Sequence, residues 1–194
     1  MSTPNATLPG PILPTVAPPQ VSRPAPDFAT QALIGRDFRS VRLSDYRGGW
    51  VLLLFYPLDF TFVCPTELVG LNDHYDDFVS RRCQVLACST DSVYSHLGWV
   101  RADERLASLR YPLLSDLTKE IAHRYGVLLP EVGVALRGTF LIDDRGLLRW
   151  MSIHDMNAGR SIPEMLRVLD ALQTDKPCPC DWQRGQQTLN TDGT

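Results

Sequence analysis

Apolar and polar positions along most of this chain follow the pattern of strands alternating with helices. Residues 51–56 (VLLLFY) form a continuous apolar run, which is typical of a strand buried on both faces. A helix is predicted soon after it by apolar residues at helical spacing: Leu68, Leu71, Tyr75 and Phe78. Residues 84–88 predict a second buried strand. The next helix is predicted over residues 92–106, with Asp91 and Ser92 as candidate N-caps.

The C-terminal half continues this alternation. Residues 117–125 predict a short helix, and residues 139–143 and 147–153 predict a hairpin around a polar Asp-Arg-Gly turn. The last helix is predicted to begin at Ser161, because Ser-Ile-Pro-Glu is a capping box. Together these elements predict an α/β fold of three layers, in which helices cover a central sheet of mixed strand direction.

The first 26 residues differ in composition from the rest. They contain eight prolines and no acidic residue, a composition that disfavours helix and sheet. We expect a disordered arm at residues 1–26, a single folded domain at residues 27–174 and a C-terminal tail at residues 175–194, because 194 residues fit one domain of ordinary size. A ligand for a partner protein and the remnant of a targeting segment are the alternatives for the arm.

The charge balance excludes some classes of partner. A net charge of −3 leaves no basic surface for nucleic acid and no polybasic segment for a membrane, so neither partner is expected. No apolar stretch is long enough to span a bilayer and no secretory signal is recognisable, so a cytoplasmic location is expected. No nucleotide or flavin fingerprint is present, and no cofactor is expected. The histidines lack metal-ligand spacing and are interpreted as surface or core-edge residues: His74, His96, His123 and His154.

Cys64 occupies the junction between the first buried strand and the helix after it. Pro65 suits the first turn of that helix, whose unpaired N–H groups and dipole favour a negatively charged sulfur. Position alone leaves open that Cys64 packs as a small hydrophobic residue. The odd number of five scattered cysteines argues against a static disulfide framework. Cys83 and Cys88 bound an apolar run and are predicted to be buried.

Residues 55–67 (FYPLDFTFVCPTE) resemble the active-site segment of the typical two-cysteine peroxiredoxins, the family that includes alkyl hydroperoxide reductase C subunits. This segment contains the family pattern Pro-x-x-x-Thr-x-x-Cys. The resemblance extends over about residues 25–189 and implies a thioredoxin-like fold. Further matching blocks lie at residues 25–28, 43–46, 85–91, 114–116, 125–128 and 137–143.

The resemblance assigns a role to each matching residue of the site. Cys64 is implied to be the peroxidatic nucleophile, which attacks a hydroperoxide and becomes a sulfenic acid. Thr61 is implied to place its hydroxyl against the sulfur and the peroxide, Pro57 to shield the pocket from water, and Arg137 to hold a permanent positive charge beside both reacting groups. Glu67 matches the position that orients this arginine; a solvated first-turn carboxylate is the alternative.

The tail supplies candidates for the second half of the reaction. Cys178 matches the resolving cysteine of the family, which in typical members comes from the partner subunit, and Trp182 matches the tryptophan after it. Cys180 departs from the family pattern. It can be a second resolving thiol, a thiol that exchanges with the Cys64–Cys178 disulfide, or a spectator. Two cysteines alone make a poor zinc site, so no metal is expected.

Two further departures concern regulation. The segment between residues 99 and 114 lacks the Gly-Gly-Leu-Gly insertion of oxidation-sensitive members, and the sequence shows no Tyr-Phe-bearing terminal helix. Both elements slow the local unfolding around the peroxidatic cysteine in the members that carry them. We therefore expect an enzyme that resists overoxidation.

The predicted function is that of a peroxidase. The resemblance implies reduction of hydrogen peroxide and organic hydroperoxides by Cys64, resolution by Cys178 and regeneration by thioredoxin or a dedicated disulfide reductase. It also implies a homodimer, with a decameric ring of five dimers as the less certain assembly. The alternatives are a redox-regulated holdase chaperone or peroxide-signalling relay, and a one-cysteine peroxidase resolved by an external thiol.

Overall fold

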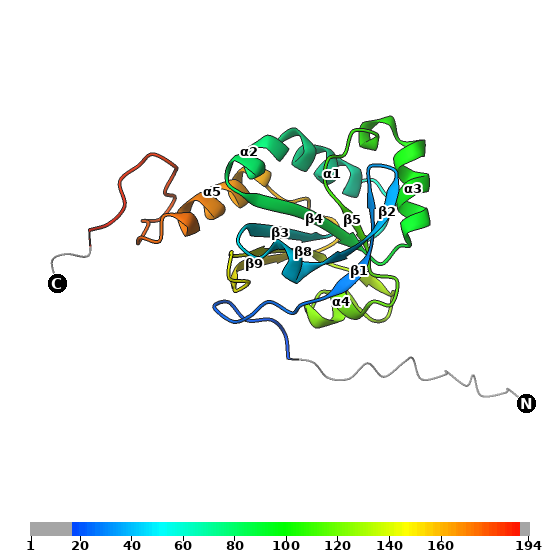
Figure 1. Ribbon diagram of the computed structural model, residues 1–194, viewed down its shortest axis with the longest axis horizontal. Helices are drawn as coiled ribbons and strands as arrows, with labels where there is room; N and C mark the ends of the chain where they lie inside the picture. The colour runs from blue at the N-terminus through cyan, green and yellow to red at the C-terminus, as the bar shows by residue number, and fades with distance from the viewer. Residues whose placement is uncertain (1–16, 191–194) are drawn as a thin grey trace, which may run out of the picture.

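The computed structural model describes residues 17–190 and contains a central seven-stranded sheet (Figure 1). Its strand order is β2-β1-β5-β4-β3-β8-β9. The bounds of these strands are β1 Ala29–Ile34, β2 Asp37–Arg42, β3 Trp50–Phe55, β4 Cys83–Ser89, β5 Leu113–Ser115, β8 Arg137–Ile142 and β9 Leu148–His154. Strands β3, β4 and β5 pair in parallel, whereas the other neighbours pair antiparallel, so the prediction of a mixed sheet is confirmed.

Helices cover both faces of this sheet, as the three-layer prediction requires. Helices α1, α2, α3 and α5 lie on one face and α4 on the other (Figure 1). Their bounds are α1 Cys64–Asp73, α2 Tyr75–Ser80, α3 Val93–Ala102, α4 Glu120–Arg124 and α5 Ile162–Gln173. The remaining elements are two 3-10 turns, η1 Leu43–Tyr46 and η2 Glu104–Leu106, and a small hairpin, β6 Leu128–Leu129 with β7 Val134–Ala135.

Strand β3 is buried on both faces, as its apolar run predicts. Leu52 and Leu54 belong to the core under α1 and α5, whereas Leu53 and Phe55 belong to the core under α4. Successive side chains of a strand point to opposite faces, so one short strand contributes to both cores. The end of β3 is therefore held firmly, and the site is built at that end.

The predicted helix boundaries need three corrections. The apolar pattern that begins at Leu68 covers two helices, because the backbone leaves the helical conformation at His74. Helix α3 ends at Ala102, and the Asp103 carboxylate then accepts a hydrogen bond from the Arg105 N–H to cap a separate turn. Helix α4 begins at Glu120 rather than at the predicted residue 117. The carboxylate of Asp116 accepts hydrogen bonds from N–H groups in the first turn of this helix.

The predicted N-caps are partly confirmed. The Ser92 hydroxyl accepts from the Ser95 N–H at the start of α3, and the Ser161 hydroxyl accepts from the Glu164 N–H at the start of α5. The carboxylate of Glu164 pairs with Arg167 instead of returning to the N-cap. The second half of the expected capping box is thus replaced by an ion pair.

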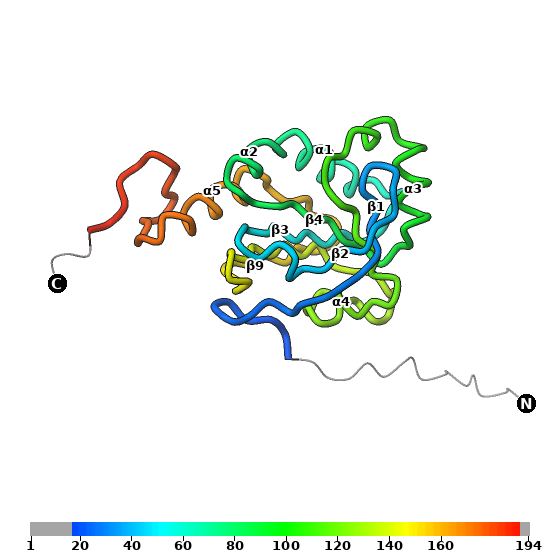
Figure 2. Tube along the Cα trace, viewed as in Figure 1, coloured from blue at the N-terminus to red at the C-terminus, as the bar shows by residue number. Residues whose placement is uncertain are grey.

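The chain before β1 contacts the sheet at the start of β9, away from the C-terminal end of β3. Ser22 N donates to Leu148 O (2.7 Å), Leu148 N donates to Arg23 O (2.9 Å), and Ala25 N donates to Gly146 O (3.0 Å). Figure 2 shows this segment running beside the start of β9. Part of the expected arm is therefore paired with the sheet, while residues 1–16 of that arm lie outside the described residues.

Candidate active site

Cys64 is the first residue of α1 and follows the loop that leaves the end of β3. Pro65 lies in the first turn, where its missing N–H removes no helical hydrogen bond. The Cys64 side chain is 0% exposed. The sulfur thus stands at the N-terminal end of a helix and is enclosed by protein.

Arg137 reaches this sulfur from β8. Strand β8 pairs antiparallel with β3, which brings the start of β8 beside the end of β3. The Arg137 Nη1 atom lies 3.5 Å from the Cys64 Sγ atom, and the residue is 3% exposed. The Nε atom donates to the backbone oxygen of Met156 (2.8 Å). The structure therefore brings Cys64 and Arg137 together across 73 residues of sequence.

Glu67 holds this arginine in place. Its Oε2 atom accepts from Arg137 Nη1 at 2.7 Å, and the residue is only 5% exposed. Burial by itself would raise the pKa of Glu67, but hydrogen bonds and charge from Arg160, together with Arg137, hold this pKa below its ordinary value. Glu67 is therefore a buried ionised partner of the arginines, and the alternative of a solvated first-turn carboxylate is wrong.

Arg160 is a site residue that the sequence did not reveal. It directly precedes the N-cap of α5. Its backbone N–H (2.9 Å), its Nε atom (2.8 Å) and its Nη2 atom (2.8 Å) all donate hydrogen bonds to the Glu67 carboxylate. Its Nη1 atom donates to the backbone oxygen of Gly138 (2.8 Å) and to the hydroxyl of Thr139 (3.2 Å). Arg160 and Glu67 are 93 positions apart in the sequence, so no local spacing could have signalled the pair.

Thr61 and Pro57 lie in the loop before Cys64. Pro57 is buried directly beyond β3, and Thr61 is partly exposed. The Thr61 hydroxyl donates its hydrogen bond to the backbone oxygen of Leu58 (2.9 Å) rather than to the sulfur. In this conformation the oxygen of Thr61 is free to accept a further hydrogen bond.

A buried polar cluster fixes the same loop to α3. The carboxylate of Asp59 accepts from the Tyr56 hydroxyl (2.9 Å) and from the Ser95 hydroxyl (2.8 Å), and it lies 2.8 Å from the Nδ1 atom of His96. The other ring nitrogen of His96 faces the backbone oxygen of Leu114 (3.2 Å). Both ring nitrogens therefore lie within hydrogen-bonding distance of an oxygen atom.

His96 is 0% exposed, so the interpretation of this histidine as a surface or core-edge residue is wrong. Its hydrogen bonds to Asp59 and Leu114 explain how an imidazole can be accommodated in the interior. The role of Asp59 could not be recognised from the sequence either, because its hydrogen-bond partners lie up to 37 positions away.

Cys83 and Cys88 are buried in β4, as predicted. Burial raises the pKa of Cys83 to about 12, and burial followed by the charge of Asp116 raises the pKa of Cys88 well above its ordinary value. Both side chains therefore remain thiols at neutral pH and are poor nucleophiles.

Cys178 and Cys180 lie on the tail beyond α5. Figure 1 shows this tail projecting away from the body of the fold, on the side away from α3. Cys178 is partly exposed, and Cys180 is exposed. The structure thus does not bring Cys178 to Cys64 within one chain. Over residues 17–190, no group of three or more His, Cys, Asp or Glu side chains could hold a metal ion.

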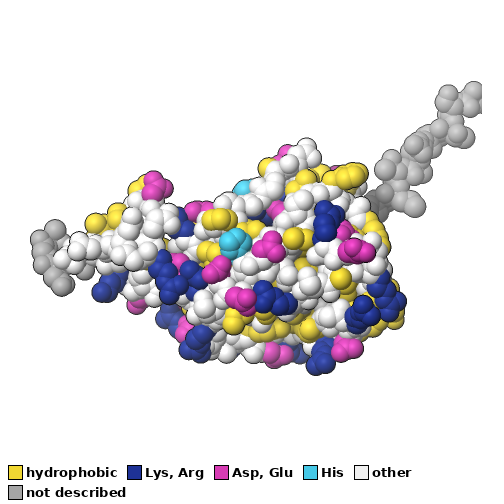
Figure 3. All heavy atoms as spheres, turned by 90° about the horizontal axis from the view of Figure 1, so that it is seen from above, with side chains coloured by type: hydrophobic (Ala, Val, Ile, Leu, Met, Phe, Trp, Pro, Cys, Tyr) yellow, Lys and Arg dark blue, Asp and Glu magenta, His cyan; other side chains and the backbone are white. Residues whose placement is uncertain are grey.

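The face seen from above in Figure 3 carries charges of both signs in an interspersed pattern. None of the described helices is long and apolar enough to cross a membrane; α5 has 12 residues.

The chain was compared with known proteins. The model of the AhpC/TSA family matches residues 21–151. A thioredoxin peroxidase of Echinococcus granulosus is 50% identical over 176 residues, which cover 87% of this chain and 91% of that protein. Peroxiredoxin-2 of Rattus norvegicus is 46% identical over 176 residues, which cover 87% of this chain and 89% of that protein.

Solved structures show the same likeness. The reduced 2-Cys peroxiredoxin of Plasmodium vivax is 39% identical and matches with a TM-score of 0.84 over 88% of this chain and 92% of that one. Enterococcus faecalis AhpC is 36% identical, with a TM-score of 0.79 over 83% of this chain and 99% of that one. These findings confirm the thioredoxin-like fold and the resemblance drawn from residues 55–67. Because the family model and relatives of nearly the same length all match, the chain belongs to the AhpC/TSA family and is a peroxiredoxin.

Proposed function

We propose that this thiol-dependent peroxidase uses Cys64 as its peroxidatic nucleophile. The observation that carries the proposal is the position of the Arg137 guanidinium, 3.5 Å from the Cys64 sulfur and bound to the buried carboxylate of Glu67. A sulfur at a helix N-terminus beside a fixed cation is suited to react as a thiolate. Hydrogen peroxide and small organic hydroperoxides are the proposed substrates.

The chemical step follows from this geometry. The Cys64 thiolate attacks one peroxide oxygen, the O–O bond breaks, and the departing oxygen leaves with the electron pair and takes up a proton. Negative charge moves from the sulfur to the departing oxygen, so a donor that can reach both atoms lowers the barrier. Arg137 has further N–H groups for that purpose, and the free acceptor site of Thr61 can orient a peroxide O–H. Pro57 limits the access of water.

Resolution of the sulfenic acid is assigned to Cys178 of a partner subunit. Figure 1 shows the C-terminal tail projecting away from α1, which supports a resolving sulfur from a second subunit. The Cys64 sulfur is fully buried, and a disulfide requires Cα atoms about 4 to 7 Å apart. The first turn of α1 must therefore unwind for the disulfide to form.

A homodimer is the proposed working form. Among residues 17–190, the outer edge of β9 is paired at Leu147 and Leu148 alone, and β9 exposes Met151 and Ile153 on one face. An open strand edge with apolar side chains is suited to pairing with a second copy. A decameric ring is the larger assembly proposed from the family, thioredoxin or a dedicated disulfide reductase is the proposed electron donor, and a reducing cytoplasm is the proposed location.

The test measures peroxide consumption with dithiothreitol as the reductant. Cys64→Ser is expected to abolish consumption, whereas Cys83→Ser should retain it because that thiol is buried and unreactive. One equivalent of peroxide should also give a sulfenic acid that dimedone traps at Cys64. Full activity of Cys64→Ser would refute the assignment.

A further inference from the structure

The segment after Cys178 forms a turn that presents Cys180 to solvent. The Trp182 N–H donates to the backbone oxygen of Pro179 (3.2 Å), and Asp181, at the third position of this turn, has a positive φ of 56°. That conformation is the one a type II turn requires at its third residue. Trp182 anchors the turn, since it is 4% exposed and its Nε1 atom donates to the backbone oxygen of Gln186 (3.1 Å). Cys180 therefore sits at the corner of a defined turn.

A positive charge lies beside Cys180. Arg167 on α5 donates to the backbone oxygen of Trp182 (3.3 Å), which holds its guanidinium next to the turn. The pKa of Arg167 is raised, first by its hydrogen bond to Glu164 and in smaller part by Asp181 and Cys180. Arg167 therefore interacts with Cys180 as well as with Glu164 and Asp181.

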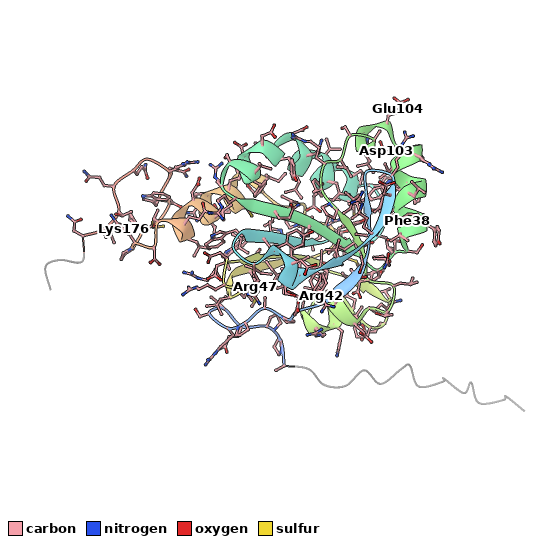
Figure 4. All side chains as sticks on the ribbon, in the orientation of Figure 1. Phe38, Arg42, Arg47, Asp103, Glu104 and Lys176 are labelled. Carbon is pink, nitrogen blue, oxygen red and sulfur yellow. The ribbon has the colours of Figure 1, made fainter. Side chains whose placement is uncertain are left out.

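Cys178 is the less accessible of the two tail cysteines. It packs where the tail leaves α5, just beyond Lys176, which is labelled in Figure 4. Its sulfur lies 3.4 Å from the Thr174 hydroxyl and 3.8 Å from the backbone oxygen of Ala171. Residues two positions apart along a chain can bring their Cα atoms within the roughly 4 to 7 Å that a disulfide needs. The two sulfurs can thus pair without moving the domain.

We propose that Cys180 takes over the oxidised sulfur of Cys178 and releases Cys64 before any external reductant acts. This inference rests on the proposed function, because it requires a Cys64–Cys178 disulfide between subunits. The Cys180 thiol loses its proton to solvent, and its thiolate attacks the Cys178 sulfur. A Cys178–Cys180 bond forms, the Cys64–Cys178 bond breaks, and the electron pair of the broken bond stays on Cys64 as a thiolate. The exchange involves no net oxidation.

The folded site favours this direction of exchange. While Cys64 is bonded to a partner chain, its sulfur is held away from Arg137 and the first turn of α1 is open. Release lets the sulfur return to its buried position, 3.5 Å from Arg137 Nη1, and lets the helical turn close. The remaining tail disulfide lies on an exposed turn, where a reductase can reach it. The peroxide site is thereby restored while the tail still carries the Cys178–Cys180 disulfide and awaits reduction.

The sequence makes the two disulfides easy to distinguish after trypsin digestion. Residues 48–81 form a tryptic peptide in which Cys64 is the single cysteine. Residues 168–184 form one peptide that contains both Cys178 and Cys180, because trypsin does not cleave the Lys176–Pro177 bond. A tail disulfide makes this second peptide about 2 Da lighter, whereas a Cys64–Cys178 disulfide joins the two peptides.

The experiment treats the full-length protein with one equivalent of hydrogen peroxide without reductant and traps free thiols with N-ethylmaleimide at timed intervals. In the wild type, the joined peptides should rise first and then decline as the lighter 168–184 peptide accumulates. In Cys180→Ser, the joined peptides should persist at a level about tenfold higher. Cys64→Ser is the control and should form neither product, which shows that peroxide does not oxidise the tail directly.

Other outcomes overturn the proposal. Equal and persistent levels of the joined peptides in the wild type and Cys180→Ser would show that no exchange occurs, while leaving the peroxidase assignment intact. Joined peptides that form in Cys178→Ser as fast as in the wild type would make Cys180 itself the resolving residue and reverse the order of steps. A Cys64 peptide that remains unoxidised in every variant would instead refute the proposed function.

Discussion

Glu67 balances the charge of two arginines in this site and fixes their positions. Two buried arginines donate to its two oxygens, and one of them, Arg137, also contacts the Cys64 sulfur. Removing one member of a buried ion pair leaves the other charge uncompensated and typically costs about 3 to 5 kcal/mol. Glu67 therefore supports both the fold and the placement of the Arg137 guanidinium beside Cys64.

The lowered pKa of Glu67 predicts a pH dependence of stability. Because its pKa is lower in the folded protein than the ordinary 4.5, its contribution is present above pH 4.5 and is lost as the pH falls through the folded value. At pH 7 the wild type should have a larger free energy of unfolding than Glu67→Gln, and this difference should shrink below pH 4.5. Urea denaturation of both proteins between about pH 3 and pH 7 measures this difference in the free energy of unfolding. A difference that is constant with pH would contradict the prediction.

Arg160 is expected to position Arg137 through Glu67. Arg160→Lys keeps the charge but loses the bidentate grip on the carboxylate, so kcat/KM for peroxide should fall by about tenfold. Arg105→Lys is the matched control, because its pair with Asp103 lies on the surface and should leave the rate unchanged. Stopped-flow measurement of sulfenic acid formation at Cys64 gives both rates. A full rate in Arg160→Lys would remove this residue from the site.

Sequence reasoning predicted the site residues that a short contiguous segment and a family pattern encode. Residues 55–67 point to Cys64, Thr61 and Glu67, and the family pattern adds Arg137. Arg160 and His96 were missed or misinterpreted because their environment is created by packing between distant segments. A buried carboxylate such as Glu67 needs compensating charges, but the sequence does not say which arginine supplies them.

At the scale of elements, periodicity located the strands and helices, and side-chain caps decided where they end. The apolar pattern extended α3 to residue 106, but the carboxylate of Asp103 caps a new turn and ends the helix at Ala102. Figure 4 shows Asp103 and Glu104 at this outer end of α3. Such hydrogen bonds compete with helical ones and have no signature in the apolar pattern.

The short connection after α3 bears on oxidative damage. Between Ala102 and β5 the chain forms only the η2 turn, so no inserted loop of the kind expected in oxidation-sensitive peroxiredoxins packs there. We therefore predict that the first turn of α1 opens readily and that Cys64 resists conversion to sulfinic acid. Mass spectrometry of Cys64 after turnover in rising peroxide measures this. Sulfinic acid at a small excess of peroxide would contradict the prediction.

At the scale of the whole molecule, the open edge of β9 predicts a dimer that catalysis needs. Ile153→Arg places a charge on the exposed apolar face of this edge and should give a monomer in sedimentation experiments. The monomer should still form the Cys64 sulfenic acid, but it should lose the disulfide between subunits. Arg39→Glu on β2, at the opposite edge of the sheet, is the control and should remain dimeric. A dimer that survives in Ile153→Arg would place the interface elsewhere.

The complete burial of the Cys64 sulfur also makes the balance between repair and damage depend on temperature. Resolution must break the contact with Arg137 and the hydrogen bonds of the first turn of α1, whereas attack on peroxide breaks neither. Steps that unfold structure have large activation enthalpies, so cooling slows resolution more than it slows the attack. The sulfenic acid then survives longer between the two steps. The same protein is therefore expected to be more vulnerable to overoxidation in the cold than in the warmth.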